Sequence, residues 1–193
     1  MIDIFDRIKQ NPGPLGQFAD YGEGYFIFPR LDGPIGPRMK FQGKEVIFWS
    51  ANDYLGLCNH PEVLETDAKA AAEYGMFYPM GARAMSGETD NHLKLEKELA
   101  EFVQKDSAYL LNFGYQGMVS TIDALVSRHD VIVYDSNSHA CIVDGVRLHM
   151  GKSFMFRHND MDSFEKNIKR ATKVAEENGG GILVITEGVF GMT

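Results

Sequence analysis

The stretch VIVYDSNSHA, residues 131–140, is an apolar run that ends in a cluster of polar side chains. A continuous run of Val and Ile is typical of a strand that is buried on both faces of a sheet. Similar short runs occupy residues 108–111, 153–156 and 182–185, and segments with helical spacing separate them. Strands that alternate with helices predict an α/β domain whose mostly parallel sheet is covered on both faces.

The first sixty residues have a different composition, and we expect them to form an N-terminal arm and a β-hairpin segment. The arm, residues 11–36, is rich in Gly and Pro, and two extended runs follow it at 38–41 and 45–49. Gln42, Gly43 and Lys44 between these runs predict a hairpin turn.

Residues 61–193 are expected to form part of one large domain, which opens with two helices. The first begins at Pro61 and ends at Gly75, since Pro is common in a first turn and Gly at a C-terminal cap. The second runs from Thr89, a residue type that commonly serves as an N-cap, to Gln104.

Composition excludes several classes of protein. The chain has 193 residues, 44% of them hydrophobic, and a net charge of -8 that is spread along the helical segments as a solvated surface. Without clustered Lys and Arg, we expect no nucleic-acid partner, and the basic stretch 166–173 has the spacing of a solvated helix face. No apolar run is long enough for a membrane span, so we expect a cytoplasmic protein. Cys58 and Cys141 lack the spacing of a zinc site and are expected to be reduced.

The residues that follow each strand are the candidates for chemistry, because ligands of open parallel sheets bind at the carboxyl ends of the strands. After the first strand, Gly114 precedes a helix whose N-terminal amides can bind a phosphate, although glycine is also common in such turns. His139 follows the second strand, where a histidine is also common as a cap or surface residue. Glu187 follows the fourth strand. Their convergence on one edge favours a ligand site.

Six motifs follow one another in the order of the α-oxoamine synthase family. Residues 50–57, SANDYLGL, resemble its SNDYLGL signature. The other motifs that resemble the family are GAR and SG with the H..LE helix at 81–96, Gly114-Tyr115, the stretch 135–140, FRHND at 156–160 and TEGVF at 186–190. The resemblance extends from about residue 46 to the end of the chain, and only the arm lies outside it.

The resemblance implies a three-layer α/β domain of the aspartate-aminotransferase type (fold type I), incomplete in this chain, and a homodimer. It also implies a pyridoxal-phosphate-dependent condensation of an amino acid with an acyl-CoA, with decarboxylation. In such enzymes the cofactor is the electron sink, and the protein supplies binding and orientation. In the family's sheet the strand order is 3-2-4-5-6-7-1, so the first strand, 108–111, would neighbour the seventh.

The resemblance also assigns roles to single residues. Gly114 and Tyr115, with Gln116, would bind the cofactor phosphate. His139 would stack on the pyridine ring and help to hold the substrate carboxylate. Two further residues complete the candidate site, with Glu187 in the hydrogen-bonded shell beneath the cofactor and Asn52 in contact with substrate.

The sequence departs from the family pattern at two positions and in its extent. Cys141 and Gly191 stand where the family commonly has Ser. The family's later residues, which include the lysine that holds the cofactor covalently, have no counterpart up to Thr193. We therefore expect activity only when a missing C-terminal half completes the fold. The alternative is a non-catalytic binding or regulatory fragment, whereas an NAD-binding domain is disfavoured because no glycine fingerprint follows the first strand.

Overall fold

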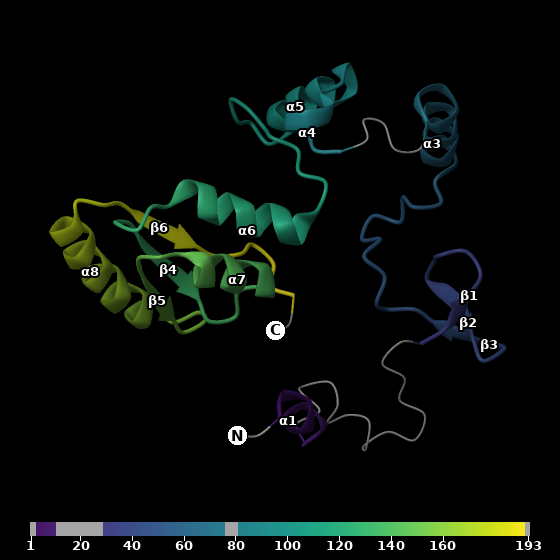
Figure 1. Cartoon of the computed structure of the whole chain (residues 1–193). Coiled ribbons are helices and arrows are strands. Elements are labelled where there is room, and N and C mark those ends of the chain that lie inside the picture. The colour runs from purple at the N-terminus through teal and green to yellow at the C-terminus, as the bar shows by residue number, and fades with distance from the viewer. Residues whose placement is uncertain (1–2, 11–28, 76–80, 192–193) are drawn as a thin grey trace. The chain divides into compact units, whose positions relative to one another are not determined.

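The computed structural model describes residues 3–10, 29–75 and 81–191 (Figure 1). The chain divides into two compact units, Met1–Gly87 and Glu88–Thr193. Residues 11–28 of the expected arm lie outside the described residues. The domain boundary that we expect at residue 60 stays a prediction.

The first unit contains the expected hairpin. Strands β2 (Arg38–Phe41) and β3 (Lys44–Ile47) pair antiparallel, and β1 (Leu31–Asp32) pairs with the other edge of β2. Gln42 and Gly43 join β2 to β3 with φ of +49° and +75°. Positive φ at both central residues is what a type I′ turn requires, so the hairpin prediction is confirmed.

Among the described residues of the first unit, three helices accompany this sheet. They are α1 (Ile4–Gln10), α3 (Pro61–Tyr74) and α4 (Arg83–Ser86). Helix α3 starts at Pro61 and ends before Gly75, whose amide donates to the Ala71 carbonyl 3.0 Å away. The bounds expected for the first helix are thus confirmed.

The second unit holds a parallel sheet and its covering helices. Its elements are α5 (Asp90–Phe102), α6 (Gly114–Leu125), β4 (Val131–Asp135), α7 (Ala140–Leu148), β5 (Lys152–Phe156), α8 (Met161–Asn178) and β6 (Ile182–Ile185). Helix α5 begins after Thr89, whose side chain caps the His92 amide as expected. Strands β5, β4 and β6 run parallel in that spatial order. They are the third, second and fourth of the strands predicted from the sequence, so the 3-2-4 part of the expected order is confirmed.

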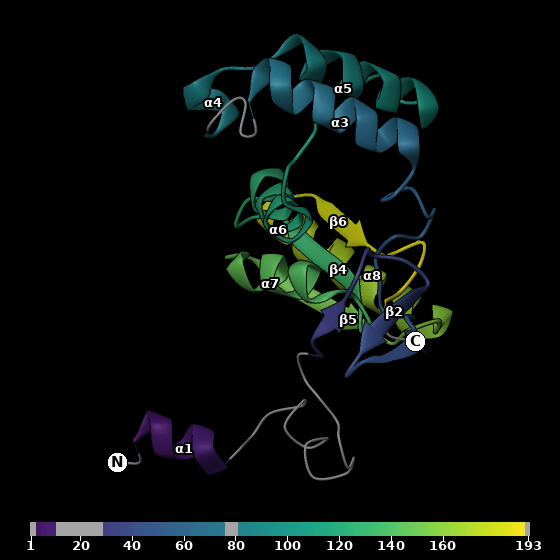
Figure 2. The ribbon, with the colours of Figure 1, turned by 90° about the vertical axis from the view of Figure 1, so that its right-hand side faces the viewer.

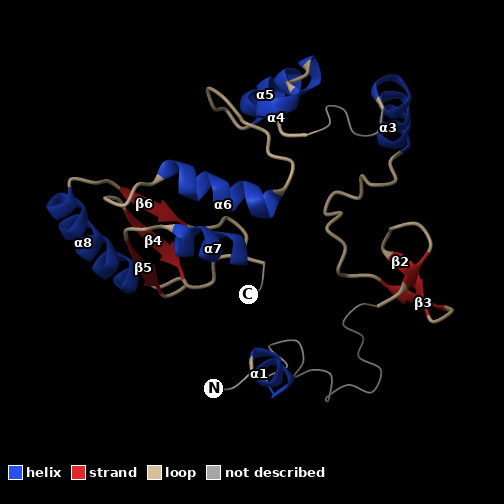
Figure 3. Ribbon diagram, in the orientation of Figure 1, coloured by secondary structure: helices blue, strands red, loops and turns tan. Residues whose placement is uncertain are grey.

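The sheet separates two apolar layers, as the pattern of β4 requires. Val131 and Val133 pack on one face with Ala171 and Ala175 of α8. Ile132 packs on the other face with residues of α6 and α7. Successive side chains of a strand point to opposite faces, so a strand covered on both sides is apolar throughout. In Figures 2 and 3 the strands lie between α8 and the pair α6 and α7, which confirms the three-layer α/β architecture.

The prediction of a strand over residues 108–111 is wrong, because the structure has no strand there. A strand needs a partner that accepts and donates its backbone hydrogen bonds. None of the described strands pairs with this segment, and the Leu110 amide donates instead to Glu96 Oε1, 2.7 Å away.

None of the helices in the described ranges has the length and apolar composition that a bilayer crossing requires.

Candidate functional site

The carboxyl ends of β4 and β6 bring two predicted site residues into contact. His139, four residues after β4, donates its backbone amide to Glu187 Oε1 at 2.6 Å, and Glu187 lies two residues after β6. These residues are 48 positions apart in the chain. They meet because β4 and β6 are parallel neighbours, whose carboxyl ends share one edge of the sheet.

The local fold fixes the imidazole of His139. His139 is the N-cap of α7, and its Nδ1 accepts a hydrogen bond from the Cys141 amide at 3.2 Å. Since an amide can only donate, Nδ1 is an acceptor, and the neutral ring carries its proton on Nε2. Cys141 Sγ lies 2.9 Å from the same nitrogen, and burial raises the pKa of this thiol. The site therefore presents Nε2 as a hydrogen-bond donor.

Tyr115, the second residue of α6, contacts His139 through its ring. The two ring centroids are 6.1 Å apart, with planes at 72° in an edge-to-face arrangement. The Tyr115 hydroxyl donates to Asp144 Oδ2 on α7, and this bond raises the pKa of Tyr115 and lowers that of Asp144. Arg147 binds the other oxygen of Asp144 at 3.0 Å. Tyr115 thus joins the start of α6 to α7.

The N-terminus of α6 is open to an anion. Phe113, the N-cap, offers no side-chain cap, and the first amides of a helix have no partner inside the helix. These amides belong to Gly114, Tyr115 and Gln116. A Cβ atom placed on Gly114 would meet no atom within 4 Å, so a ligand can approach the backbone closely.

A buried hydroxyl at the same edge also lacks a partner. Among the described residues that are not exposed, Ser138 Oγ is the one buried side-chain polar atom without a hydrogen bond. Most such atoms in native structures have a partner in the protein or solvent. Ser138 immediately precedes His139 in the loop between β4 and α7. The open amides and this hydroxyl both fit a phosphate-bearing ligand.

Asn52, the predicted substrate contact, belongs to the first unit. Its Oδ1 accepts a hydrogen bond from the Tyr54 hydroxyl at 3.3 Å. The structure does not place it relative to the strand edge of the second unit, so its contact with substrate stays a prediction.

The neighbouring Asp53 organises the loop that carries Asn52, a role that the sequence analysis missed. Its carboxylate accepts from the amides of Leu57 and Cys58 and, at 2.8 Å, from the Cys58 thiol. The bond from the thiol lowers the pKa of Asp53 and raises that of Cys58. An Asp whose side chain binds nearby backbone amides is a common turn device, and Gly56 with φ of +65° follows three residues later.

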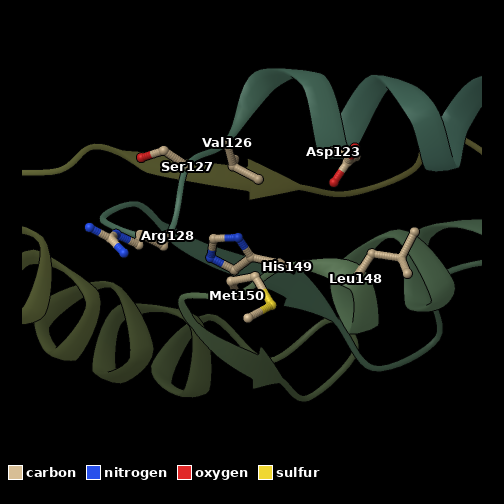
Figure 4. A pocket seen from close by; sticks show the side chains of 7 residues that line it. All are labelled: Asp123, Val126, Ser127, Arg128, Leu148, His149 and Met150. Atoms are coloured by element: carbon tan, nitrogen blue, oxygen red, sulfur yellow. The ribbon is translucent and has the colours of Figure 1, made fainter.

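A pocket of about 380 Å³ lies at the opposite edge of the sheet (Figure 4). Its lining comes from α6, from the last residue of α7 and from the segments that precede β4 and β5, and includes Asp123, Arg128 and His149. None of the predicted site residues lines it. The strand edge of His139 and Glu187 is therefore the candidate site.

Residues 44–193 match the family described as aminotransferase class I and II. The chain is 66% identical over 192 residues to the cysteate-C-fatty acyltransferase of Capnocytophaga ochracea, which covers 100% of this chain and 46% of that relative. It is 36% identical over 168 residues to a serine palmitoyltransferase of Bacteroides ovatus, which covers 87% of this chain and 41% of that relative. The chain thus spans about half the length of the curated relatives that it matches.

A solved structure shares the fold. The serine palmitoyltransferase of Sphingomonas wittichii superimposes with a TM-score of 0.77 at 23% identity. The match covers 95% of this chain and 52% of that structure. The fold assigned from the motifs is confirmed by this likeness.

Proposed function

Because the chain belongs to the aminotransferase class I and II family, we propose that it forms the cofactor-binding half of a pyridoxal-phosphate-dependent acyltransferase. The reaction joins an amino acid to the acyl group of an acyl-CoA and releases carbon dioxide. The observation that carries this proposal is the convergence of Glu187, His139 and Tyr115 at one strand edge. Two of the relatives are named acyltransferases of an amino acid, which supports the same reaction class.

Cysteate is the amino acid that we propose, with a fatty acyl group as the second substrate. The support is identity, which is 66% to the cysteate-C-fatty acyltransferase and 36% to the serine palmitoyltransferase. Cysteate differs from serine in carrying a sulfonate where serine has a hydroxyl. Serine is therefore the natural competitor in an assay.

The residues of the strand edge then have defined tasks. The amides of Gly114, Tyr115 and Gln116 would bind the cofactor phosphate, since a helix N-terminus offers both free donors and a positive dipole end. The open space at Gly114 and the unpartnered Ser138 hydroxyl support this placement. When bound, pyridoxal phosphate supplies the electron sink for bonds broken at the amino acid's α-carbon.

His139 orients both the cofactor and the substrate in this proposal. Its imidazole would pack against the cofactor ring, and Nε2–H would donate to the substrate carboxylate and help to orient it. Glu187 fixes the His139 backbone at 2.6 Å, and the Tyr115 ring restricts rotation of the imidazole. Loss of carbon dioxide requires the bond to the substrate carboxylate to be held in one orientation. An imidazole that cannot rotate would hold the carboxylate there and so favour decarboxylation.

The test uses the completed protein, by which we mean residues 1–193 continued by the C-terminal half that the relatives possess. The assay follows CoA thiol release from a long-chain acyl-CoA with cysteate, with serine or with no amino acid, each with and without pyridoxal phosphate. We expect release that requires both the cofactor and cysteate. Release with serine but not cysteate would overturn the substrate assignment. Cofactor binding without any release would favour the alternative, a non-catalytic binding or regulatory fragment.

A further inference from the structure

A second side-chain pair lies at the same edge of the sheet, between the ends of β4 and β5. Asp135, the last residue of β4, is only 3% exposed. Both of its carboxylate oxygens lie 3.0 Å from Nδ1 of His158, which follows β5 by two residues. Asp135 is paired in register with Phe156 of β5, so the parallel strands bring the two side chains together.

The pair holds the loop that leads to His139. Asp135 Oδ1 accepts the Asn137 amide at 2.8 Å, and the Asp135 carbonyl accepts the Ser138 amide at 3.1 Å. The amide of His158 donates to Ser136 Oγ at 3.0 Å. Three consecutive residues, 136–138, are therefore bound to Asp135 or His158. The loop has few ways to move without breaking these bonds.

His158 is fixed on its other side as well. The Asn159 side-chain amide donates to Nε2 at 3.0 Å, which leaves Nδ1 to donate to Asp135. The Phe190 ring packs edge-on against the imidazole, with centroids 4.5 Å apart and planes at 73°. Phe190 lies on the segment after β6 that also supplies Glu187 to His139. Both ring nitrogens are thus engaged within the protein, so His158 is not placed to exchange a proton with a ligand.

We propose that Asp135 and His158 are positioning residues of the cofactor site, which fix the 136–138 loop and the β6 segment so that His139 is held in its working orientation. This inference rests on the proposed function only for what His139 then does. The pair acts from outside the site, through the loop on one side and Phe190 on the other. A shift of about 1 Å in an orienting group can cost on the order of 100-fold in rate, so a loosened loop should be visible in catalysis.

Two substitutions of His158 distinguish the loss of its hydrogen bond to Asp135 from the loss of its side-chain volume. His158→Ala removes the donor to Asp135, whereas His158→Asn keeps a side-chain N–H the same number of bonds from the backbone as Nδ1. Asn167→Ala is the matched control, because Asn167 is also buried, at 7% exposed, and binds the Met155 and Ser163 carbonyls on the far side of β5. Its loss should lower stability without reaching the 136–139 loop.

The first readout needs no cofactor. In the completed protein without pyridoxal phosphate, amide hydrogen exchange of residues 137–139 should be at least about tenfold faster in His158→Ala than in wild type. His158→Asn should restore most of the protection, and Asn167→Ala should leave it unchanged. Unchanged exchange in His158→Ala, or an equal rise in Asn167→Ala, would overturn the inference.

The second readout uses the loaded protein. We expect His158→Ala to alter the circular dichroism of bound pyridoxal phosphate and to lower kcat by about 10- to 100-fold, with partial recovery in His158→Asn. A kcat and a cofactor signal within twofold of wild type would contradict the proposal. If wild type itself bound no pyridoxal phosphate, the proposed function would fail, and the exchange measurement would still decide whether the pair fixes the loop.

Discussion

Replacing Gly114 with Val tests the phosphate site with little effect on the fold itself. A Cβ atom at Gly114 would have no neighbour within 4 Å, and its φ lies outside the left-handed region. Neither a steric clash nor backbone strain is therefore expected. In a helix, Val is a better former than Gly, so the free energy of unfolding without cofactor should stay within about 1 kcal/mol of wild type.

Cofactor affinity should respond much more strongly. The branched side chain would occupy the space through which the phosphate approaches the amides of residues 114–116. A hydrogen bond to a charged group contributes about 1.5–3 kcal/mol, and affinity changes tenfold for every 1.4 kcal/mol. The loss of one such bond should weaken pyridoxal phosphate binding by about 10- to 150-fold.

The assay is an absorbance titration of the completed protein with pyridoxal phosphate, paired with urea unfolding of the same samples. Gly117→Ala is the control in the same helix, because its Cβ would lie 2.9 Å from Leu111 Cδ1. Such overpacking should cost about 1–3 kcal/mol of stability and leave the first amides of α6 intact. Normal cofactor affinity in Gly114→Val, or an equal loss of affinity in Gly117→Ala, would refute the phosphate assignment.

Three further predictions concern the stacking residue, the opposite edge of the sheet and the chain alone. His139→Ala should weaken cofactor retention by about 2- to 13-fold, the worth of one aromatic pair, and an unchanged absorption spectrum and activity would contradict this. Hydrogen bonds from the Gly181 amide and from Ser127 lower the pKa of Asp130 from 3.8 to about 2, so its stabilisation is present above about pH 4 and is lost as the pH falls through about 2. In urea unfolding of the completed protein at pH 6, the free energy of unfolding should therefore be larger for wild type than for Asp130→Asn. If the difference between the two did not shrink towards pH 2, these hydrogen bonds would not be what stabilises the Asp130 carboxylate. Residues 1–193 alone should melt without a cooperative transition, because none of the described strands supplies the sheet neighbour that residues 108–111 need, and a sharp melt with amide protection there would show otherwise.

Local rules predicted most of the fold from the sequence. The hairpin followed from Gly43 in a short turn, α3 from Pro61 and Gly75, and α5 from its Thr89 cap. The segment 108–111 shows where such rules fail. Its apolar pattern suits a strand, but strand formation depends on a neighbouring strand more than on local propensity, and none of the described strands supplies one.

Part of the site could be predicted from the sequence, because the parallel sheet brings the ends of its strands to one edge. His139 and Glu187 follow parallel strands, and parallel strands end at one edge, so their contact could be expected. The bond between Tyr115 and Asp144 could not, because it depends on how α6 packs on α7. The pairing of Asp135 with His158 lies between these cases, since both residues lie at the carboxyl ends of neighbouring strands but sequence spacing does not specify which side chains bind.

The most direct test is an experimental structure of the completed protein with bound pyridoxal phosphate. We predict that the phosphate accepts hydrogen bonds from the amides of residues 114–116. The imidazole of His139 should stack on the pyridine ring, with carbon atoms about 3.5–4.0 Å apart. A phosphate bound away from the start of α6, or a pyridine ring that does not touch His139, would contradict these predictions.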